Sequence, residues 1–147
     1  MRVCLHPDAC ETLEGLTRAA GRDRETGGLL FGVTTAAAVM VFRASGPNPH
    51  QPLEGSDFHQ DATYQQGWAD AMMAVLELEA VGDWHSHPCT APGIASPHDL
   101  SEQARLAGVY QAPAWLLFVL QDRGPDGVNL AAYLAGEPVE VSPWPST

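Results

Sequence analysis

The segment with the clearest chemical potential is G-D-W-H-S-H-P, residues 82–88, in which two of the six histidines are separated by one residue. Alternate side chains of a β-strand point to the same face, so His85 and His87 would lie together with Cα atoms ~6.6 Å apart. Both imidazoles could then bind one ion at the Zn–N distance of ~2.0–2.1 Å. The pair predicts half of a metal site, although surface histidine pairs also occur without a metal.

A catalytic zinc needs a third protein ligand and an open fourth position for water. Asp99 is the natural candidate, since it lies in the first turn of a helix predicted to have Ser96 as its N-cap and Pro97 at its first position. The same residues also have a purely structural interpretation. Ser-x-x-Asp resembles a capping box, and the helix dipole favours an acidic residue in the first turn. Both interpretations of Asp99 remain open on these residues alone.

A further acidic residue, Glu25, directly precedes the glycine-rich stretch T-G-G-L-L-F-G. A single glutamate at the edge of a strand is most often exposed to solvent. Glu25 could instead be turned inward over the site formed by the histidines.

Taken in order, Glu25 before G-G-L-L-F-G, then H-S-H-P, then S-P-H-D-L resemble the motif of the JAMM/MPN-domain zinc isopeptidases. The resemblance extends over most of the chain, includes Asn48, and is closest to small prokaryotic members. It implies a cytidine-deaminase-like α/β (mixed α+β) fold, with a mixed, curved sheet and about three helices packed on it.

The resemblance also implies the chemistry. One Zn²⁺ would be bound by His85, His87 and Asp99, with a water as fourth ligand. Glu25 would move the proton of that water to the departing amine, and Ser96 would donate a hydrogen bond to the developing oxyanion. The reaction would be hydrolysis of a peptide or isopeptide bond after the C-terminal Gly-Gly of a ubiquitin-like or sulfur-carrier protein. The alternative is a catalytically inactive scaffold of the same fold, but this chain retains all four roles.

The spacing departs from the family in one respect. Eleven residues separate His87 from Asp99, one more than is usual, so counting alone selects His98 as the third ligand. Adjacent helical residues point ~100° apart, so only one of the two can face a metal. We favour Asp99, because the loop 90–95 can absorb the extra residue while Ser-x-x-Asp stays intact. Cys89 is either a packing residue or a thiol that could bind the metal.

Composition limits the remaining possibilities. The 147 residues suit a single domain over 1–147, and the net charge of −11 makes nucleic-acid binding unfavourable. No run of ~18 apolar residues or apolar leader is present, so we expect no membrane association. Three cysteines without a C-x-x-C pair suit the reducing cytoplasm. The sequence is compatible with a homodimer without requiring one.

Two other metal-site classes do not fit. Deaminase zinc sites need H-x-E and P-C-x-x-C, and this chain has no second cysteine after Pro88-Cys89. A TIM-barrel metallohydrolase needs ~250 residues.

Hydrophobic periodicity predicts the elements that must position these residues. Interleaved strands and three helices predict a mixed sheet with the helices packed on it. Tyr64, Trp68, Met72, Val75 and Leu76 are expected to form the apolar stripe of the second helix. The loop 45–59 either clamps a substrate tail or is simply mobile. We expect helices over 7–20, 61–80 and 96–108, strands over 1–6, 25–33, 36–45, 81–87, 112–122 and 128–136, and one edge strand in 137–147.

Overall fold

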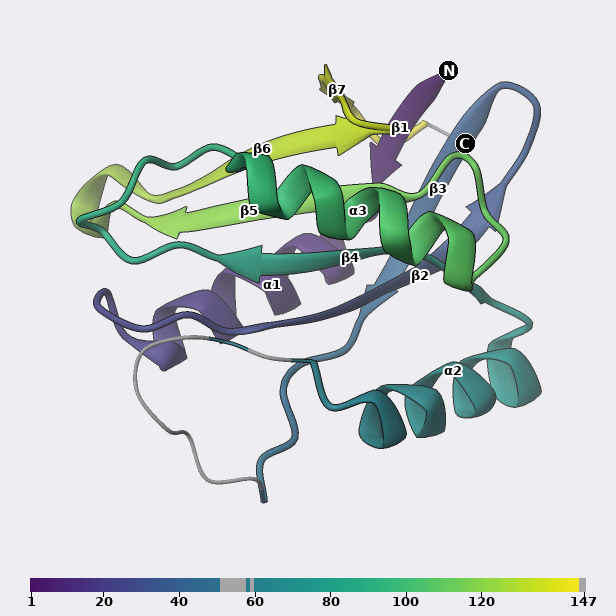
Figure 1. Ribbon diagram of the computed structural model, residues 1–147, viewed down its shortest axis with the longest axis horizontal. Helices are drawn as coiled ribbons and strands as arrows, with labels where there is room; N and C mark the ends of the chain where they lie inside the picture. Colours follow the sequence, from purple (N-terminus) through teal and green to yellow (C-terminus); the bar gives the residue numbers. More distant parts are fainter. Residues whose placement is uncertain (51–57, 59, 146–147) are drawn as a thin grey trace.

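The computed structural model describes residues 1–50, 58 and 60–145 (Figure 1). Its elements confirm the predicted mixed α/β architecture. The helices are α1 (Pro7–Ala20), α2 (Ala62–Leu76) and α3 (Pro97–Val109). The strands are β1 (Arg2–Leu5), β2 (Gly27–Thr34), β3 (Ala38–Ala44), β4 (Glu79–Ser86), β5 (Leu116–Asp122), β6 (Val128–Leu134), β7 (Glu137–Val139) and β8 (Val141–Ser142), with a short 3₁₀ turn at Gly124–Asp126. Among the described residues, the helices are too short or too polar to cross a bilayer.

The strands form one sheet in the order β7-β6-β5-β4-β2-β3-β1-β8. β4 runs parallel to β5, and β1 runs parallel to both β3 and β8, whereas the other pairs are antiparallel. β7 and β8 lie at opposite ends of this order although only Glu140 separates them in the chain. The sheet therefore curves until its two edges approach one another, as in a nearly closed barrel.

This closure corrects one prediction. The tail was expected to add a single edge strand, but it adds two short strands to two different edges. Val139 and Val141 both pack against the main core cluster, so the tail follows the buried apolar side chains from one edge to the other.

Helices cover both faces of the sheet. α1 packs on one face, where Leu13 contacts a core that includes Trp84 and Phe118. α2 and α3 cover the other face, where Trp68 and Leu106 pack against Leu29, Phe31 and Trp115. The alternation of β4 explains the division, because Trp84 points toward α1 while its neighbours in the strand point toward α3. Figure 1 shows α3 running along the sheet above β4 and β5.

α2 is shorter than the sequence predicted. It ends at Leu76, Glu77 adopts a left-handed conformation with φ 55°, and Glu79 already belongs to β4. The predicted apolar stripe is correct for Trp68 and Met72, which pack on the sheet, but wrong for Val75 and Leu76, which are 77% and 45% exposed. The buried residue of α2 is the polar Gln65 instead.

Gln65 belongs to a buried hydrogen-bond network centred on Ser45. The Ser45 hydroxyl donates to Gln65 Oε1 at 2.6 Å and accepts from the Leu29 amide at 2.9 Å. The Ser45 carbonyl accepts from Trp84 Nε1 at 2.8 Å. A Cβ on Gly28 would lie 2.1 Å from that carbonyl oxygen, so the two backbones approach this closely only because residue 28 has no side chain.

Gly28→Ala is therefore expected to lower the free energy of unfolding by more than ~2 kcal/mol, because backbone rather than a flexible side chain must move. Urea denaturation of the two proteins measures the difference. Gly67→Ala is the matched control: nothing lies within 4 Å of its Cβ position in α2, and the change should stabilise by roughly 0.5–1 kcal/mol. Equal effects at the two positions would contradict the close approach at Gly28.

Candidate metal centre

The predicted histidine pair lies where β4 ends. His85 is the penultimate residue of the strand, and the His87 amide continues the pairing by donating to the Leu120 carbonyl at 2.8 Å. The side chain of Trp84 is fully buried on the opposite face, as alternation predicted. Both imidazoles consequently face the start of α3.

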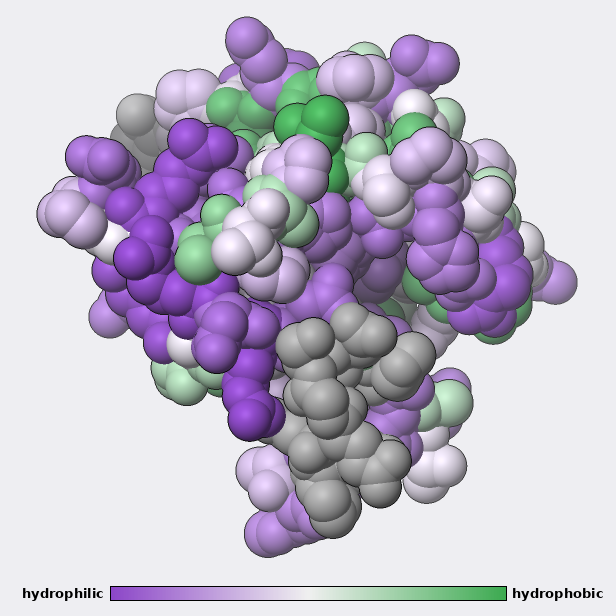
Figure 2. All heavy atoms as spheres, turned by 60° about the vertical axis from the view of Figure 1, so that its left-hand side comes forward, coloured by the Kyte–Doolittle hydropathy of each residue, from purple (hydrophilic) through white to green (hydrophobic). Residues whose placement is uncertain are grey.

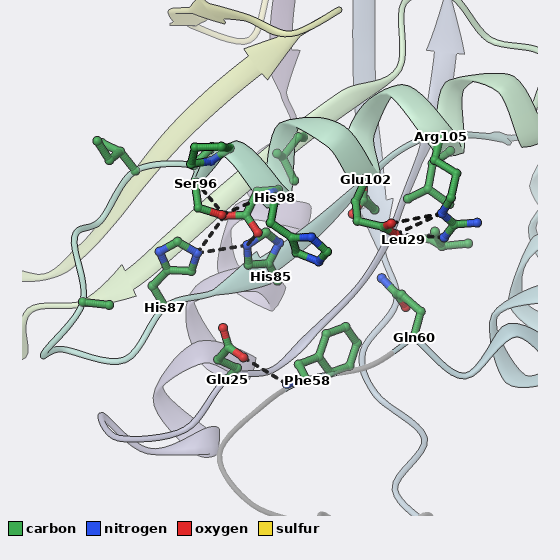
Figure 3. A pocket seen from close by; sticks show the side chains of 18 of the residues that line it. Glu25, Leu29, Phe58, Gln60, His85, His87, Ser96, His98, Glu102 and Arg105 are labelled. Carbon is green, nitrogen blue, oxygen red and sulfur yellow. Dashed lines mark hydrogen bonds and ion pairs between the residues drawn. The ribbon is translucent and has the colours of Figure 1, made fainter.

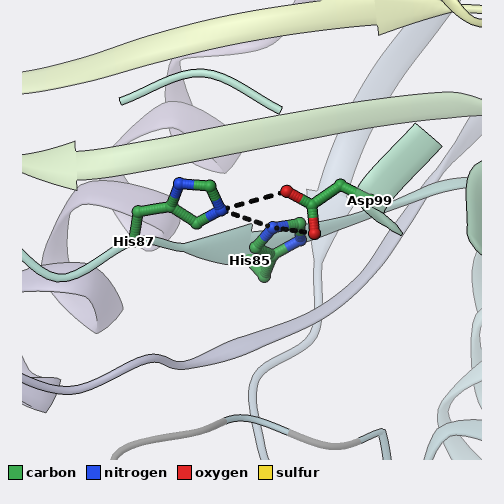
Figure 4. Close-up of side chains that lie close together, drawn as sticks. All are labelled: His85, His87 and Asp99. Atoms are coloured by element: carbon green, nitrogen blue, oxygen red, sulfur yellow. Dashed lines mark hydrogen bonds and ion pairs between the residues drawn. The ribbon is translucent and has the colours of Figure 1, made fainter. Parts of the chain in front are cut away.

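Three side chains meet at this point (Figure 4). His85 Nε2 and His87 Nε2 are 3.1 Å apart. His85 Nε2 lies 3.3 Å from Asp99 Oδ1, and His87 Nε2 lies 3.2 Å from Asp99 Oδ2. Tetrahedral ligands at the zinc distance of ~2.0–2.1 Å are separated from each other by ~3.3 Å. The group formed by His85, His87 and Asp99 could therefore hold a metal ion.

The hydrogen bond on the far side of His87 fixes its tautomer. Nδ1 of His87 lies 2.8 Å from the Pro92 carbonyl oxygen, which can only accept, so Nδ1 carries the hydrogen. In the neutral ring, Nε2 of His87 then carries a lone pair. This lone pair faces the Asp99 carboxylate, which can also only accept a hydrogen bond. A proton or a metal cation must lie between them. A histidine that donates its second nitrogen to a backbone carbonyl is the usual arrangement of a metal ligand.

The electrostatics of the group favour a cation. Burial opposes ionisation of Asp99, but hydrogen bonds from His85, His87 and the Ser96 amide outweigh it and hold the pKa of Asp99 well below its usual range. The hydrogen bond to Asp99 raises the pKa of His87 against the effect of burial, and the Pro92 carbonyl and the Glu25 charge add to the increase. Asp99 thus stays ionised beside the two imidazoles, and its charge favours a proton or a metal cation between them.

Asp99 also serves the capping role that the sequence left open. Its Oδ2 accepts from the Ser96 amide at 2.8 Å, and its own amide donates to Ser96 Oγ at 3.1 Å. The capping box is therefore present, and the remaining lone pairs of the carboxylate face the histidines. The two interpretations of Asp99 are compatible, because the cap fixes the orientation of the carboxylate.

The structure does not bring His98 into the group. His98 is exposed and lines the same cleft, while the neighbouring Asp99 faces the imidazoles. The loop before α3 is held to the sheet at several points. Gln121 Nε2 donates to the carbonyls of Pro88 and Ala91 at 2.9 and 2.7 Å, and the Ala95 amide donates to the Tyr133 hydroxyl at 3.0 Å.

Cys89, the other alternative ligand, is exposed and lies outside the group of His85, His87 and Asp99. Residues 51–57 and 59 of the predicted tail clamp at 45–59 lie outside the described residues. Within the described part, Asn48 Nδ2 donates to Asp61, the N-cap of α2, at 3.1 Å.

Sheet pairing brings Glu25 to the site from sixty residues away. Gly27 pairs with His85 in the antiparallel ladder, and the Ser86 amide donates to the Thr26 carbonyl at 2.8 Å. The next step of this register places Glu25 opposite His87. The half-buried Glu25 carboxylate lines the cleft and accepts from the Phe58 amide at 3.1 Å (Figure 3). It therefore faces the imidazoles from the side opposite α3.

The cleft around these residues has a volume of about 900 Å³ and extends along α3 to Tyr110. Its floor includes Asp83, which sequence analysis did not single out. Asp83 is 8% exposed and accepts a hydrogen bond from Trp115 Nε1 at 2.7 Å. The sequence did contain a signal for Asp83: it lies two residues before His85, and strand alternation places these two side chains on the same face. Burial raises the pKa of Asp83 to about 6, although the Trp115 hydrogen bond and His85 act in the other direction.

Asp83→Asn is expected to stabilise the metal-free protein at pH 8 but not at pH 4. Because the folded state raises the pKa, the stabilising contribution of the protonated Asp83 is complete below ~4 and is lost as pH rises through about 6. At pH 8 the buried charge costs on the order of 2–3 kcal/mol, and the amide oxygen of asparagine retains the bond to Trp115. Chemical denaturation with a chelator at both pH values measures this. An equal change at both would contradict it.

The fold and the site together define a domain of the JAB/MPN type with a group that could hold a metal ion. The chain matches the family of prokaryotic homologs of the JAB domain over residues 16–136, and it belongs to this family. It is also similar in fold to the solution structure of protein DSY2949 from Desulfitobacterium hafniense, with a TM-score of 0.70 and 21% identity over 98% of this chain and 94% of that chain. A comparison with curated proteins found no match.

Proposed function

We propose that the protein is a zinc-dependent hydrolase of peptide or isopeptide bonds, which cleaves after the C-terminal Gly-Gly of a ubiquitin-like or sulfur-carrier protein. The observation that supports it most directly is the convergence of two imidazoles and one carboxylate at 3.1–3.3 Å, with a second carboxylate, Glu25, in the same cleft. Family membership supports the same reaction class.

The donor set fits zinc. Two nitrogen atoms and one carboxylate are three protein ligands, the number that leaves a zinc site open for catalysis. A bound zinc ion supplies a water of lowered pKa and polarises the scissile carbonyl. The Pro92 carbonyl holds the His87 ring so that Nε2 faces inward, and the capping box holds Asp99 in the same way.

Glu25 is the proton carrier in this proposal. Its carboxylate is accessible from the cleft, and the bond from the Phe58 amide occupies one lone pair of Oε2 and leaves the others free. It accepts the proton of the attacking water and returns it to the departing amine. No residue of the chain forms a covalent bond to the substrate.

Ser96 is the oxyanion donor. Its hydroxyl oxygen accepts from the Asp99 amide, which leaves the hydroxyl hydrogen free to donate into the cleft. A single donor of this kind contributes on the order of 3 kcal/mol to transition-state stabilisation. The three free cysteines suit a reducing compartment, so we place the activity in the cytoplasm.

The test is release of a cargo fused through Gly-Gly to a small ubiquitin-like or sulfur-carrier protein. The zinc-loaded protein should cleave the fusion, a chelator should stop the reaction, and added zinc should restore it. A fusion with Gly-Gly changed to Ala-Ala is the substrate control. Stoichiometric zinc without cleavage of any small modifier would contradict the proposal and favour the scaffold alternative.

A further inference from the structure

A second cavity lies on the other side of the loop that follows His87. Its volume is about 330 Å³, and it is lined by Arg22, Cys89, Ala91, Pro92, Gly93, Gln121, Asp122 and Arg123. Ala91 and Pro92 also line the metal cleft, so one loop separates the two spaces. Three segments meet at this end of the molecule (Figure 1): the α1–β2 loop, the loop after β4 and the β5–β6 turn. Figure 2 shows this end from the front, and much of its surface is strongly hydrophilic.

Two arginines line this cavity from different loops. The guanidinium carbon of Arg22 lies 3.8 Å from the Cβ position of Gly124, and Arg123 Nη2 lies 3.4 Å from the Cβ position of Gly93. Within the described part of the chain, neither forms a salt bridge. Both arginines are exposed. The chain has seven basic residues against eighteen acidic ones, so a cavity lined by two arginines that form no salt bridge with a described residue is a place where an anion would be favoured.

The acidic residue that lines the cavity, Asp122, is already engaged. Its Oδ1 accepts from the Gly124 amide at 2.8 Å and lies 3.7 Å from Arg18 Nη1. Asp23 and Asp126 are exposed and do not line the cavity. Asp122 therefore lies beside Arg18, and no described carboxylate lies within salt-bridge distance of Arg22 or Arg123.

We propose that this cavity binds an anionic oxygen group, of the size of a sulfate, a phosphate or a carboxylate. Two guanidinium groups from separate loops can each donate paired hydrogen bonds to such a group, which is the recognition that arginine performs best. The source is either a free oxyanion or an acidic side chain of a protein bound beside the metal cleft. The proposal does not depend on the hydrolase activity.

Cys89 provides a reporter, because its thiol is exposed and lines the cavity. In a Cys10→Ser background, the dianionic disulfide 5,5′-dithiobis(2-nitrobenzoate) is compared with the neutral 4,4′-dithiodipyridine. In both reactions the Cys89 thiolate attacks the disulfide, forms a mixed disulfide and releases one aromatic thiolate or thione. The ratio of the two rates cancels differences in thiolate fraction and isolates the attraction of the reagent charge.

Arg22→Gln with Arg123→Gln is expected to lower the anionic-to-neutral rate ratio ~5-fold or more at low ionic strength, and less at high salt. Arg24→Gln is the matched control, since it removes an exposed charge nearby that does not line the cavity, and the ratio should change less than 2-fold. An unchanged ratio in the double variant, with an unchanged melting temperature, would overturn the proposal.

Binding itself is tested by protection of Cys89 from the neutral reagent. Sodium sulfate should protect with saturation, while sodium chloride of equal ionic strength should not. Saturable protection by sulfate identifies a free oxyanion site, and protection by a glutamate-rich peptide alone identifies a protein carboxylate as the source. If neither sulfate nor the peptide protects Cys89, the arginines only attract the anionic reagent electrostatically, and the binding proposal is wrong.

Discussion

Glu25→Gln is expected to reduce Gly-Gly cleavage by roughly 10²–10⁴-fold, the contribution that a positioned general base makes. Glutamine has nearly the same shape, and its amide oxygen can still accept from the Phe58 amide, so the cleft should keep its structure. What the variant loses is the ability to hold a proton. Steady-state rates measure the loss of proton transfer, and atomic absorption measures whether the variant still binds zinc.

Glu102→Gln is the matched control for this experiment. Glu102 lines the same cleft, but its carboxylate pairs with Arg105 at 2.9 Å instead of facing the histidines. We expect less than a 3-fold change in rate, since the paired, partly exposed charge contributes little. Full activity of the Glu25 variant with zinc bound would show that another group moves the proton. Loss of zinc from that variant would show that Glu25 acts on the metal instead.

Local patterns in the sequence were sufficient for the residues that one element positions. Strand alternation correctly placed His85 and His87 on one face and Trp84 on the other, because the period of a strand does not depend on its neighbours. The capping box at Ser96 was equally local, since its hydrogen bonds join residues within one turn. The convergence of Asp99 on the histidines follows from these two elements and one short loop.

Features that depend on the closure of the sheet were not predictable in the same way. The division of the tail between two edges requires that the edges approach each other, which no local pattern encodes. The exposure of Val75 and Leu76, at the C-terminal end of α2, depends on which part of the helix the sheet covers, whereas helical periodicity describes only the helix. The hydrogen bond between Asp83 and Trp115 joins β4 to the residue before β5, so it can form only once these two strands are paired.

Asp99→Asn is expected to lower zinc affinity by more than the ~10–100-fold that changes in outer-shell partners cause, because it removes the charge of a ligand. The amide oxygen of asparagine can still accept from the Ser96 amide, so the cap on α3 should survive. Competition with a chromogenic chelator measures the affinity, and thermal unfolding of the metal-free protein checks the cap. Substitution by alanine would confuse these effects, since it removes the ligand and the cap together.

His98→Ala is the decisive comparison with Asp99→Asn, because the spacing of the family motif selects His98 as the third metal ligand. His98 is exposed on the neighbouring helical position and takes no part in the cap, so its removal should leave zinc affinity within about 2-fold. If His98→Ala empties the site while Asp99→Asn retains zinc, the helix start must rotate by one residue when metal binds. That rotation would break both hydrogen bonds between Ser96 and Asp99, and the cost of losing a helix cap, on the order of 1 kcal/mol, opposes it. The observed cap therefore favours the carboxylate as the ligand.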